Sequence, residues 1–310
     1  MSDIHPNAQD SEFDIVDVDV RAWVETARAN PILYRDRQVT EIVLGAIGLA
    51  PSLSKTLVLK GGAVMALAFK SHRVTGDVDF TSMAEPADIT EKITTELNDS
   101  FPRTAIKLGY PDLLCQVQSV KKMPRAENFE DYDFPALRVR IGSAKRGTVE
   151  EVRLLAGKAS RVLDVEISFR DQVYAFQELN LYGAGVAVRA FTIHELIAEK
   201  LRALLQQPIR KRNRRQDVYD IAFLIGEHDF SVADKTAILT TLIEKCRSRG
   251  IDATPASMDD QEIYQRAHAE WETLALEIGD LPPFKERFTL MRELYVSLPW
   301  GAALKKTFNS

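Results

Sequence analysis

Two short segments of the sequence carry residues whose types and spacing suit metal and phosphate chemistry. The Asp-Val-Asp-Phe segment at 77–80 alternates polar and apolar residues, as a half-buried strand does, so Asp77 and Asp79 point to the same side. Two carboxylates on one face suit Mg²⁺, or Mn²⁺, bound together with a nucleoside triphosphate. Upstream, Lys60 precedes the paired glycines Gly61 and Gly62 between a strand pattern and a helix pattern. Paired glycines there permit a tight turn whose backbone approaches phosphate closely.

The Asp-x-Asp spacing alone is common. The chain carries the same Asp-Val-Asp tripeptide at 17–19, where no glycine turn precedes it. We expect that copy to lie on a solvent-exposed edge. The glycine turn is therefore what distinguishes Asp77 and Asp79 as candidates.

A lysine lies on an otherwise apolar helix face further along the chain. Thr192 and Glu195 have the spacing of a capping box, which predicts the start of a helix. Its apolar stripe consists of Ile193, Leu196, Ile197, Leu201 and Leu204, and Lys200 falls on that stripe. An inward-facing lysine needs a carboxylate or a phosphate, whereas a snorkelling lysine reaches solvent past its neighbours. The pattern alone is compatible with both.

Acidic residues on two other predicted elements complete the candidate set. In the strand predicted over 162–169, Asp164 and Glu166 share one face, which belongs either to a site or to an ordinary solvent-facing edge. Asp217 and Asp220 are one helical turn apart. An aspartate in a first turn also complements the helix dipole without any chemistry.

The elements that must position these residues fall into two groups. Besides 77–80 and 162–169, strands are predicted over 56–59, 114–120 and 137–141, and helices over 21–28, 39–49, 63–69 and 87–97. From Thr192 onward only helices are expected, including 217–225, 232–247, 261–278 and 284–298. We expect an α/β (α+β) fold with a mixed sheet, followed by a helical domain. The divisions are 1–30 for an N-terminal tail and helix, 31–188 for the core and 189–310 for the helices.

Composition narrows the class of protein. The chain has 310 residues and a net charge of -5, a balance that disfavours non-specific coating of nucleic acid. A dense basic run at 210–215 is the exception, expected as a solvated loop or as a surface that steers RNA. Cys115 and Cys246 are too far apart for a cysteine zinc site or a disulfide framework. With no export signal and no membrane-length apolar run, we expect a cytoplasmic protein without membrane contact.

In order and spacing, these motifs resemble the AbiEii/AbiGii toxin family of nucleotidyltransferases, within the DNA polymerase β-like superfamily. The first block runs from Lys60 through the glycine pair to Arg-x-Thr-x-Asp-Val-Asp-Phe at 73–80. The second comprises Glu-Lys-Leu-Arg-Ala-Leu at 199–204 and Arg-Arg-Gln-Asp-Val-Tyr-Asp-Ile at 214–221. The superfamily turn is Gly-Ser, whereas Gly62 is usual in this branch. Thr75 replaces a frequent serine and keeps its hydroxyl.

The resemblance implies a Mg²⁺-dependent transfer of NMP from an NTP to a hydroxyl of an RNA, with tRNA expected, or of a protein. It implies metal binding by Asp77 and Asp79, and it implies a toxin that inhibits growth and has a cognate antitoxin protein. The catalytic set would be Asp77, Asp79, Asp164, Lys200 and Asp217, with Glu166 as the substitute for Asp164. Asp220 would be structural or would support a residue that contacts the substrate. The nucleotide-binding set would be Lys60, Gly61, Gly62, Thr75 and Arg215.

Two other functions are compatible with the same residues. A non-catalytic nucleotide-binding protein, such as a GTP sensor, would need the glycine turn and the aspartate pair but not Asp164. A helical protein-interaction module would place its function within residues 230–310. Nucleotide binding without pyrophosphate release would indicate the sensor, and partner binding by the isolated C-terminal segment would indicate the module.

Overall fold

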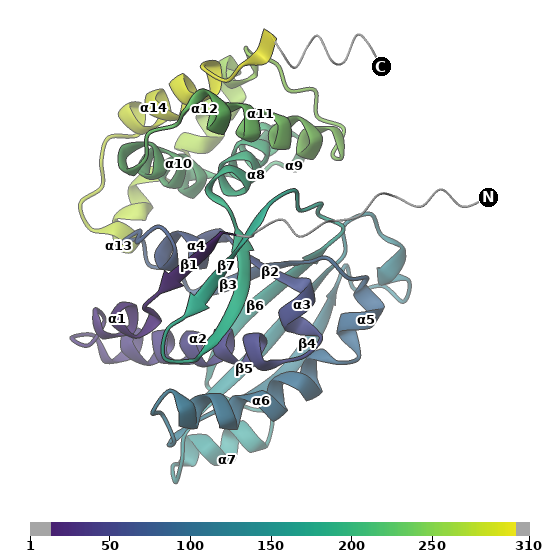
Figure 1. Ribbon diagram of the computed structural model, residues 1–310, viewed down its shortest axis with the longest axis vertical. Helices are drawn as coiled ribbons and strands as arrows, with labels where there is room; N and C mark the ends of the chain where they lie inside the picture. The colour runs from purple at the N-terminus through teal and green to yellow at the C-terminus, as the bar shows by residue number, and fades with distance from the viewer. Residues whose placement is uncertain (1–13, 302–310) are drawn as a thin grey trace.

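A single mixed sheet organises the first part of the molecule (Figure 1). The structure is a computed structural model and describes residues 14–301. Within them the strand order is β1-β7-β8-β2-β3-β6-β5-β4. The strands are β1 (Ile15–Val18), β2 (Leu57–Lys60), β3 (Asp77–Ser82), β4 (Leu113–Met123), β5 (Ala136–Lys145), β6 (Arg161–Phe169), β7 (Phe176–Leu181) and β8 (Val186–Phe191). Strand β3 is antiparallel to β2 and parallel to β6, which places it centrally.

Helices cover one face of this sheet and leave part of the other face polar. The helices of this half are α1 (Val20–Glu25), α2 (Pro31–Leu49), α3 (Leu53–Thr56), α4 (Gly61–Leu67), α5 (Pro86–Thr90), α6 (Ile93–Lys107) and α7 (Val149–Leu155). Helices α2 and α6 pack against each other and against the sheet. The apolar strand residues Val78, Phe80, Val165 and Ile167 are buried in the core. Because successive strand residues alternate sides, the aspartates between them face the opposite side.

The second half is helical and lies to one side of the sheet, at the top of the view in Figure 1. Its helices are α8 (Ile193–Leu205), α9 (Gln207–Arg210), α10 (Arg215–Glu227), α11 (Val232–Arg247), α12 (Gln261–His268), α13 (Ala275–Ile278) and α14 (Phe284–Val296). The Thr192 side chain accepts a hydrogen bond from the Glu195 amide and so begins α8 as predicted. The mixed sheet followed by helices confirms the predicted fold class.

Three strands and several helices differ from the sequence expectation. The helix expected over 87–97 is divided into α5 and α6, α2 begins at Pro31 instead of residue 39, and α3, α7 and α9 are additional. Strands β1, β7 and β8 are additional, and β7 and β8 form an antiparallel pair. The proposed boundary at residue 188 falls inside β8. The helix expected over 261–278 is interrupted between α12 and α13 by the 3₁₀ turn Trp271–Leu274, before which Glu270 adopts a φ of 61°.

Other expectations can be placed on the fold. The second Asp-Val-Asp copy lies at the end of the edge strand β1, where Asp17 and Asp19 are exposed as expected. Most of the expected N-terminal tail and the last nine residues of the helical domain lie outside the described residues. Within 14–301, no helix combines the length and apolar character needed to cross a membrane.

Candidate functional site

The glycine turn packs directly against the aspartate strand. Strand β2 ends at Lys60, which pairs with Asp79 of β3, and α4 begins at the next residue. Gly61 adopts a φ of +68°, and a Cβ there would overlap Asp79 Oδ2. A Cβ on Gly62 would lie 2.7 Å from Thr75 Oγ1. Gly61 therefore requires glycine, and at Gly62 any side chain would displace Thr75, because the backbone passes close to the side chains of the site.

Four carboxylates face the same side of the central strands. Asp77 lies opposite Asp164 and Asp79 opposite Glu166 in the parallel pairing of β3 and β6. Burial and the neighbouring Asp77 raise the pKa of Asp79 to about 6. A divalent cation would relieve this concentration of negative charge, so Asp77 and Asp79 fit the metal site that the sequence suggests.

Two of these carboxylates have polar surroundings of their own. Thr75 Oγ1 donates to Asp77 Oδ1 at 3.1 Å, which holds that carboxylate beside the turn. Asp164 Oδ1 is inaccessible to solvent and has no hydrogen-bond partner among the described residues. Its nearest cation is Arg140, whose Nε is 3.6 Å away. The Asp164 side chain as a whole is 49% exposed, so a ligand can reach the carboxyl group, although not at Oδ1.

Asp77 and Asp79 belong to no larger metal-ligand cluster among the described residues. Within residues 14–301, no group of three or more His, Cys, Asp or Glu side chains is arranged to hold a metal ion. A cation on Asp77 and Asp79 would take its remaining oxygen ligands from phosphate and water, as Mg²⁺ commonly does.

The structure resolves the orientation of Lys200. Its side chain is buried, and Nζ donates to Asp217 Oδ1 at 2.9 Å and to Asp220 Oδ2 at 2.7 Å. Burial lowers the pKa of Lys200, but the two carboxylates outweigh burial and raise it above its ordinary value. Lys200 is therefore a charged lysine held inside by carboxylates, not a snorkelling one.

Asp217 and Asp220 differ in their remaining contacts. Asp220 is fully buried and also accepts from Arg73 Nε and Nη2, each at 3.0 Å. Asp217 Oδ2 is buried without a hydrogen-bond partner in the described part of the chain. Asp220 is thus saturated by protein cations, whereas the nearest cation to Asp217 Oδ2 is the more distant Arg214, whose Nη1 is 3.9 Å away.

Arg73 joins the two halves of the molecule, and sequence reasoning did not select it. Besides its paired bonds to Asp220 of α10, its Nη1 lies 3.1 Å from Glu277 of α13. The backbone amide of Val74 donates to the Glu277 carbonyl at 3.0 Å. The sequence feature that could have identified Arg73 is its position four residues before Asp77, inside the first motif block.

A second buried ion pair, also missed from sequence, holds Lys60. Its Nζ donates to Ser168 Oγ at 2.7 Å and lies 3.3 Å from Asp171 Oδ2. Asp171 also pairs with Arg249. Burial raises the pKa of Asp171, but Lys60 and Arg249 outweigh it and hold that pKa well below its usual range.

Most of these residues line one cleft of about 960 Å³ between the sheet and the helices, whereas Asp220 and Arg249 do not line it. Residues predicted for the site that line it are Lys60, Gly61, Gly62, Thr75, Asp77, Asp79, Asp164, Glu166, Lys200 and Asp217. Arg215 does not line the cleft, and its Nη1 lies 3.4 Å from Glu270 Oε2 instead. Arg212 and Arg214 from the same basic run do reach the cleft wall.

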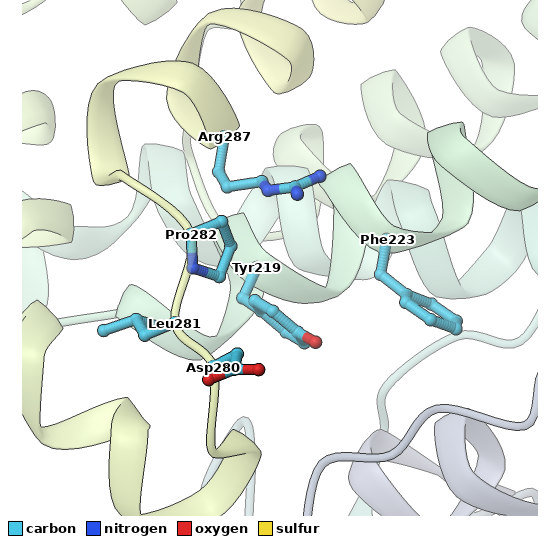
Figure 2. A pocket seen from close by; sticks show the side chains of 6 residues that line it. All are labelled: Tyr219, Phe223, Asp280, Leu281, Pro282 and Arg287. Carbon is cyan, nitrogen blue, oxygen red and sulfur yellow. The ribbon is translucent and has the colours of Figure 1, made fainter.

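A smaller hollow of about 360 Å³ lies elsewhere in the helical half (Figure 2). Tyr219 and Phe223 of α10, Arg287 of α14 and the connecting residues 280–282 line it. It contains none of the residues that the sequence analysis selected. The candidate chemistry is therefore concentrated in the larger cleft.

The amino-acid sequence matches a known family over most of its length. Residues 43–290 match the family described as nucleotidyl transferase AbiEii toxin, type IV TA system. The MenT4 nucleotidyltransferase toxin from Mycobacterium tuberculosis H37Rv is 15% identical, covering 90% of this chain and 89% of that chain with a TM-score of 0.49. JHP933 from Helicobacter pylori is 15% identical, covering 91% of this chain and 99% of that chain with a TM-score of 0.42.

No curated protein matches the chain significantly. The family match nevertheless spans well over half of the chain and includes both motif blocks, which confirms the resemblance seen in the sequence. The chain therefore belongs to the AbiEii family of nucleotidyltransferase toxins of type IV toxin–antitoxin systems.

Proposed function

We propose that this protein transfers NMP from an NTP to a hydroxyl of an RNA acceptor, with tRNA as the expected acceptor, and that the transfer depends on Mg²⁺. The observation that supports this proposal most is the cleft itself. It gathers the glycine turn, the aspartate pair and Lys200, which are separated by up to 140 positions in the sequence, from 60 to 200. Such an arrangement supplies charge stabilisation and positioning, the two main contributions of protein groups to phosphoryl transfer.

Asp77 and Asp79 would hold the metal ion. When bound, Mg²⁺ would neutralise charge on the triphosphate oxygens. The Gly61–Gly62 turn presents bare backbone at the cleft wall, beside Asp79, and so leaves space for the phosphates. Thr75 would fix the Asp77 carboxylate through its hydroxyl.

The chemical step exchanges one phosphorus–oxygen bond for another. The acceptor oxygen forms a bond to the α-phosphorus while the bond to the bridging oxygen breaks, and pyrophosphate leaves. The hydroxyl proton would pass to Asp164, whose side chain is 49% exposed at the cleft wall. Glu166 is the alternative base, and its Oε2 lies 3.5 Å from Arg138 Nη2.

Lys200 would stabilise the charge that develops on the phosphates. Asp220 and Asp217 keep it protonated, and Asp217 would position it from the cleft side. With these roles, the helical region 189–310 would be a part of the active site, because Lys200 and Asp217 both come from it.

Growth inhibition and its control follow from the family. We propose that a separate cognate antitoxin protein neutralises the activity. Both NTP and tRNA are met in the cytoplasm, which we propose as the working compartment.

Labelled-nucleotide transfer tests this function. The protein is incubated with Mg²⁺, total tRNA and each of four α-³²P-labelled NTPs, beside Asp77→Ala. Asp17→Ala is a matched control, because it changes the same tripeptide on the exposed edge strand. We expect label in RNA with the wild type and Asp17→Ala but not with Asp77→Ala. Nucleotide binding without label transfer to RNA or protein would instead support the non-catalytic sensor.

A further inference from the structure

A row of basic residues continues the cleft face of the sheet beyond the candidate base. In the antiparallel pairing of β5 and β6, Arg140 lies opposite Asp164 and Arg138 opposite Glu166. In the next pairing, Lys121 of β4 lies opposite Arg138. Residues directly opposite each other in antiparallel strands point to the same face. Lys121, Arg138 and Arg140 therefore share the face of Asp164 and extend from it to the edge strand β4; we name these three residues the β4–β5 basic strip.

The charges of this strip are available to a ligand. The Arg138 and Arg140 side chains are 46% and 41% exposed, and their contacts with Glu166 and Asp164 are long, at 3.5 and 3.6 Å. Exposed ion pairs of this kind contribute little stability and exchange readily for another anion. Lys121 is exposed, and within residues 14–301 no carboxylate lies within ion-pair distance of it.

The strip also lies on the side from which an acceptor must approach. Attacking and leaving oxygens are roughly in line at a transferred phosphorus, so the acceptor enters opposite the departing pyrophosphate. The glycine turn and Lys200 mark the phosphate side of the cleft, on β2, α4 and α8. The sheet order places β2 and β5 on opposite sides of the β3–β6 pair that carries the carboxylates. The acceptor hydroxyl that reaches Asp164 therefore comes over β5 and β4.

We propose that the β4–β5 basic strip binds the sugar-phosphate backbone of the RNA acceptor and leads its reactive hydroxyl to Asp164. This inference rests on the proposed function. Arginine donors match phosphate oxygens in pairs, and a line of cations on neighbouring strands suits a polyanion. The basic run at 210–215 belongs to the helical half, between α9 and α10, and its Arg212 and Arg214 reach the cleft wall from that side.

Charge reversal on the strip tests the proposal in the full chain. Lys121→Glu and Arg140→Glu are compared with Lys145→Glu, which changes an exposed lysine of the same strand β5 at a position facing away from the strip. The readouts are the dissociation constant of fluorescent tRNA at several salt concentrations, the KM for tRNA in labelled transfer, and the dissociation constant of NTP. Each strip variant is expected to weaken tRNA binding roughly tenfold, as loss of a charge-assisted contact does, and to flatten its salt dependence. NTP binding and the Lys145→Glu variant should match the wild type within about twofold.

The outcomes separate this proposal from the function on which it rests. If the strip variants transfer label to RNA with the wild-type KM and bind tRNA with the wild-type affinity, the proposal for the strip is overturned. The proposed function then stays intact. Absence of any transfer by the wild type overturns the function, while the tRNA-binding comparison still decides the strip. Unchanged tRNA binding together with lost binding of the purified antitoxin assigns the strip to an acidic protein and overturns the RNA proposal.

Discussion

Asp217 and Asp220 contact the same lysine but should respond differently to the same isosteric change. Asp220→Asn removes a fully buried charge that three donors of Arg73 and Lys200 contact at 2.7 to 3.0 Å. Asp217→Asn removes the charge of a carboxylate at the cleft wall, and Lys200 then keeps Asp220. We expect the first change to cost mainly stability and the second mainly activity.

The contacts set the size of each effect. Breaking a buried ion pair from one side costs about 3 to 5 kcal/mol, because the partner charge stays buried. In Asp220→Asn, Arg73 retains Glu277 and Lys200 retains Asp217, so we expect the low end, about 3 kcal/mol. Asp217→Asn weakens a single charged hydrogen bond and should cost about 1 to 2 kcal/mol.

Urea unfolding and labelled transfer measure the two effects on the same preparations. Asp217→Asn should lower the rate constant of transfer roughly tenfold or more, which needs only about 1.4 kcal/mol of lost transition-state stabilisation. Wild-type protein measured in parallel is the reference for both assays. An unfolding free energy for Asp220→Asn within about 1 kcal/mol of wild type would refute the assignment of Asp220 to a structural ion pair.

Three further predictions concern single positions. Gly61→Ala should abolish transfer, measured as label in RNA, because a Cβ would overlap the Asp79 carboxylate at a φ of +68°; undiminished transfer would contradict the close turn. Asp164→Asn should lower the transfer rate far more than Glu166→Gln, and the reverse order would make Glu166 the base. Burial raises the pKa of Asp220, but Lys200 and Arg73 outweigh it and hold the pKa below its usual range, so its contribution to stability is present above about pH 4 and is lost as pH falls through the folded value. Wild-type protein should therefore lose more unfolding free energy than Asp220→Asn between about pH 5 and pH 2, and parallel curves would contradict this ion pairing.

The local motifs were predictable because each depends on a short-range regularity. The alternation at 77–80 and 162–169 defined which carboxylates share a face, and the register of β3 with β6 places them opposite one another. The spacing of Thr192 and Glu195 marked the start of α8 correctly, but only Thr192 caps the helix, because the Glu195 carboxylate accepts from the amides of Tyr174 and Ala175 instead. The apolar stripe put Lys200 on the buried helix face but left open whether its ammonium reaches solvent, and the structure answers this with the carboxylates of Asp217 and Asp220.

The remaining features depend on contacts between distant segments. Strand β7 was hidden because Gln177 occupies a buried position in its alternation, where its side chain donates to the Phe191 carbonyl. The role of Arg73 depends on Asp220 and Glu277, which lie 147 and 204 positions away in the sequence. No periodicity reports such pairings, so neither this ion-pair network nor the Glu270 contact of Arg215 follows from local pattern.

Whether the cleft transfers the NMP moiety to RNA can be decided from the position of the label. Wild-type protein is incubated with Mg²⁺, tRNA and the NTP that supports transfer, labelled with ³²P at either the α- or the γ-phosphate. We expect the amount of α-label that enters RNA to equal the amount of pyrophosphate released. The γ-label should appear only in pyrophosphate. Entry of γ-label into RNA, or pyrophosphate release without α-label in any acceptor, would contradict the proposed transfer.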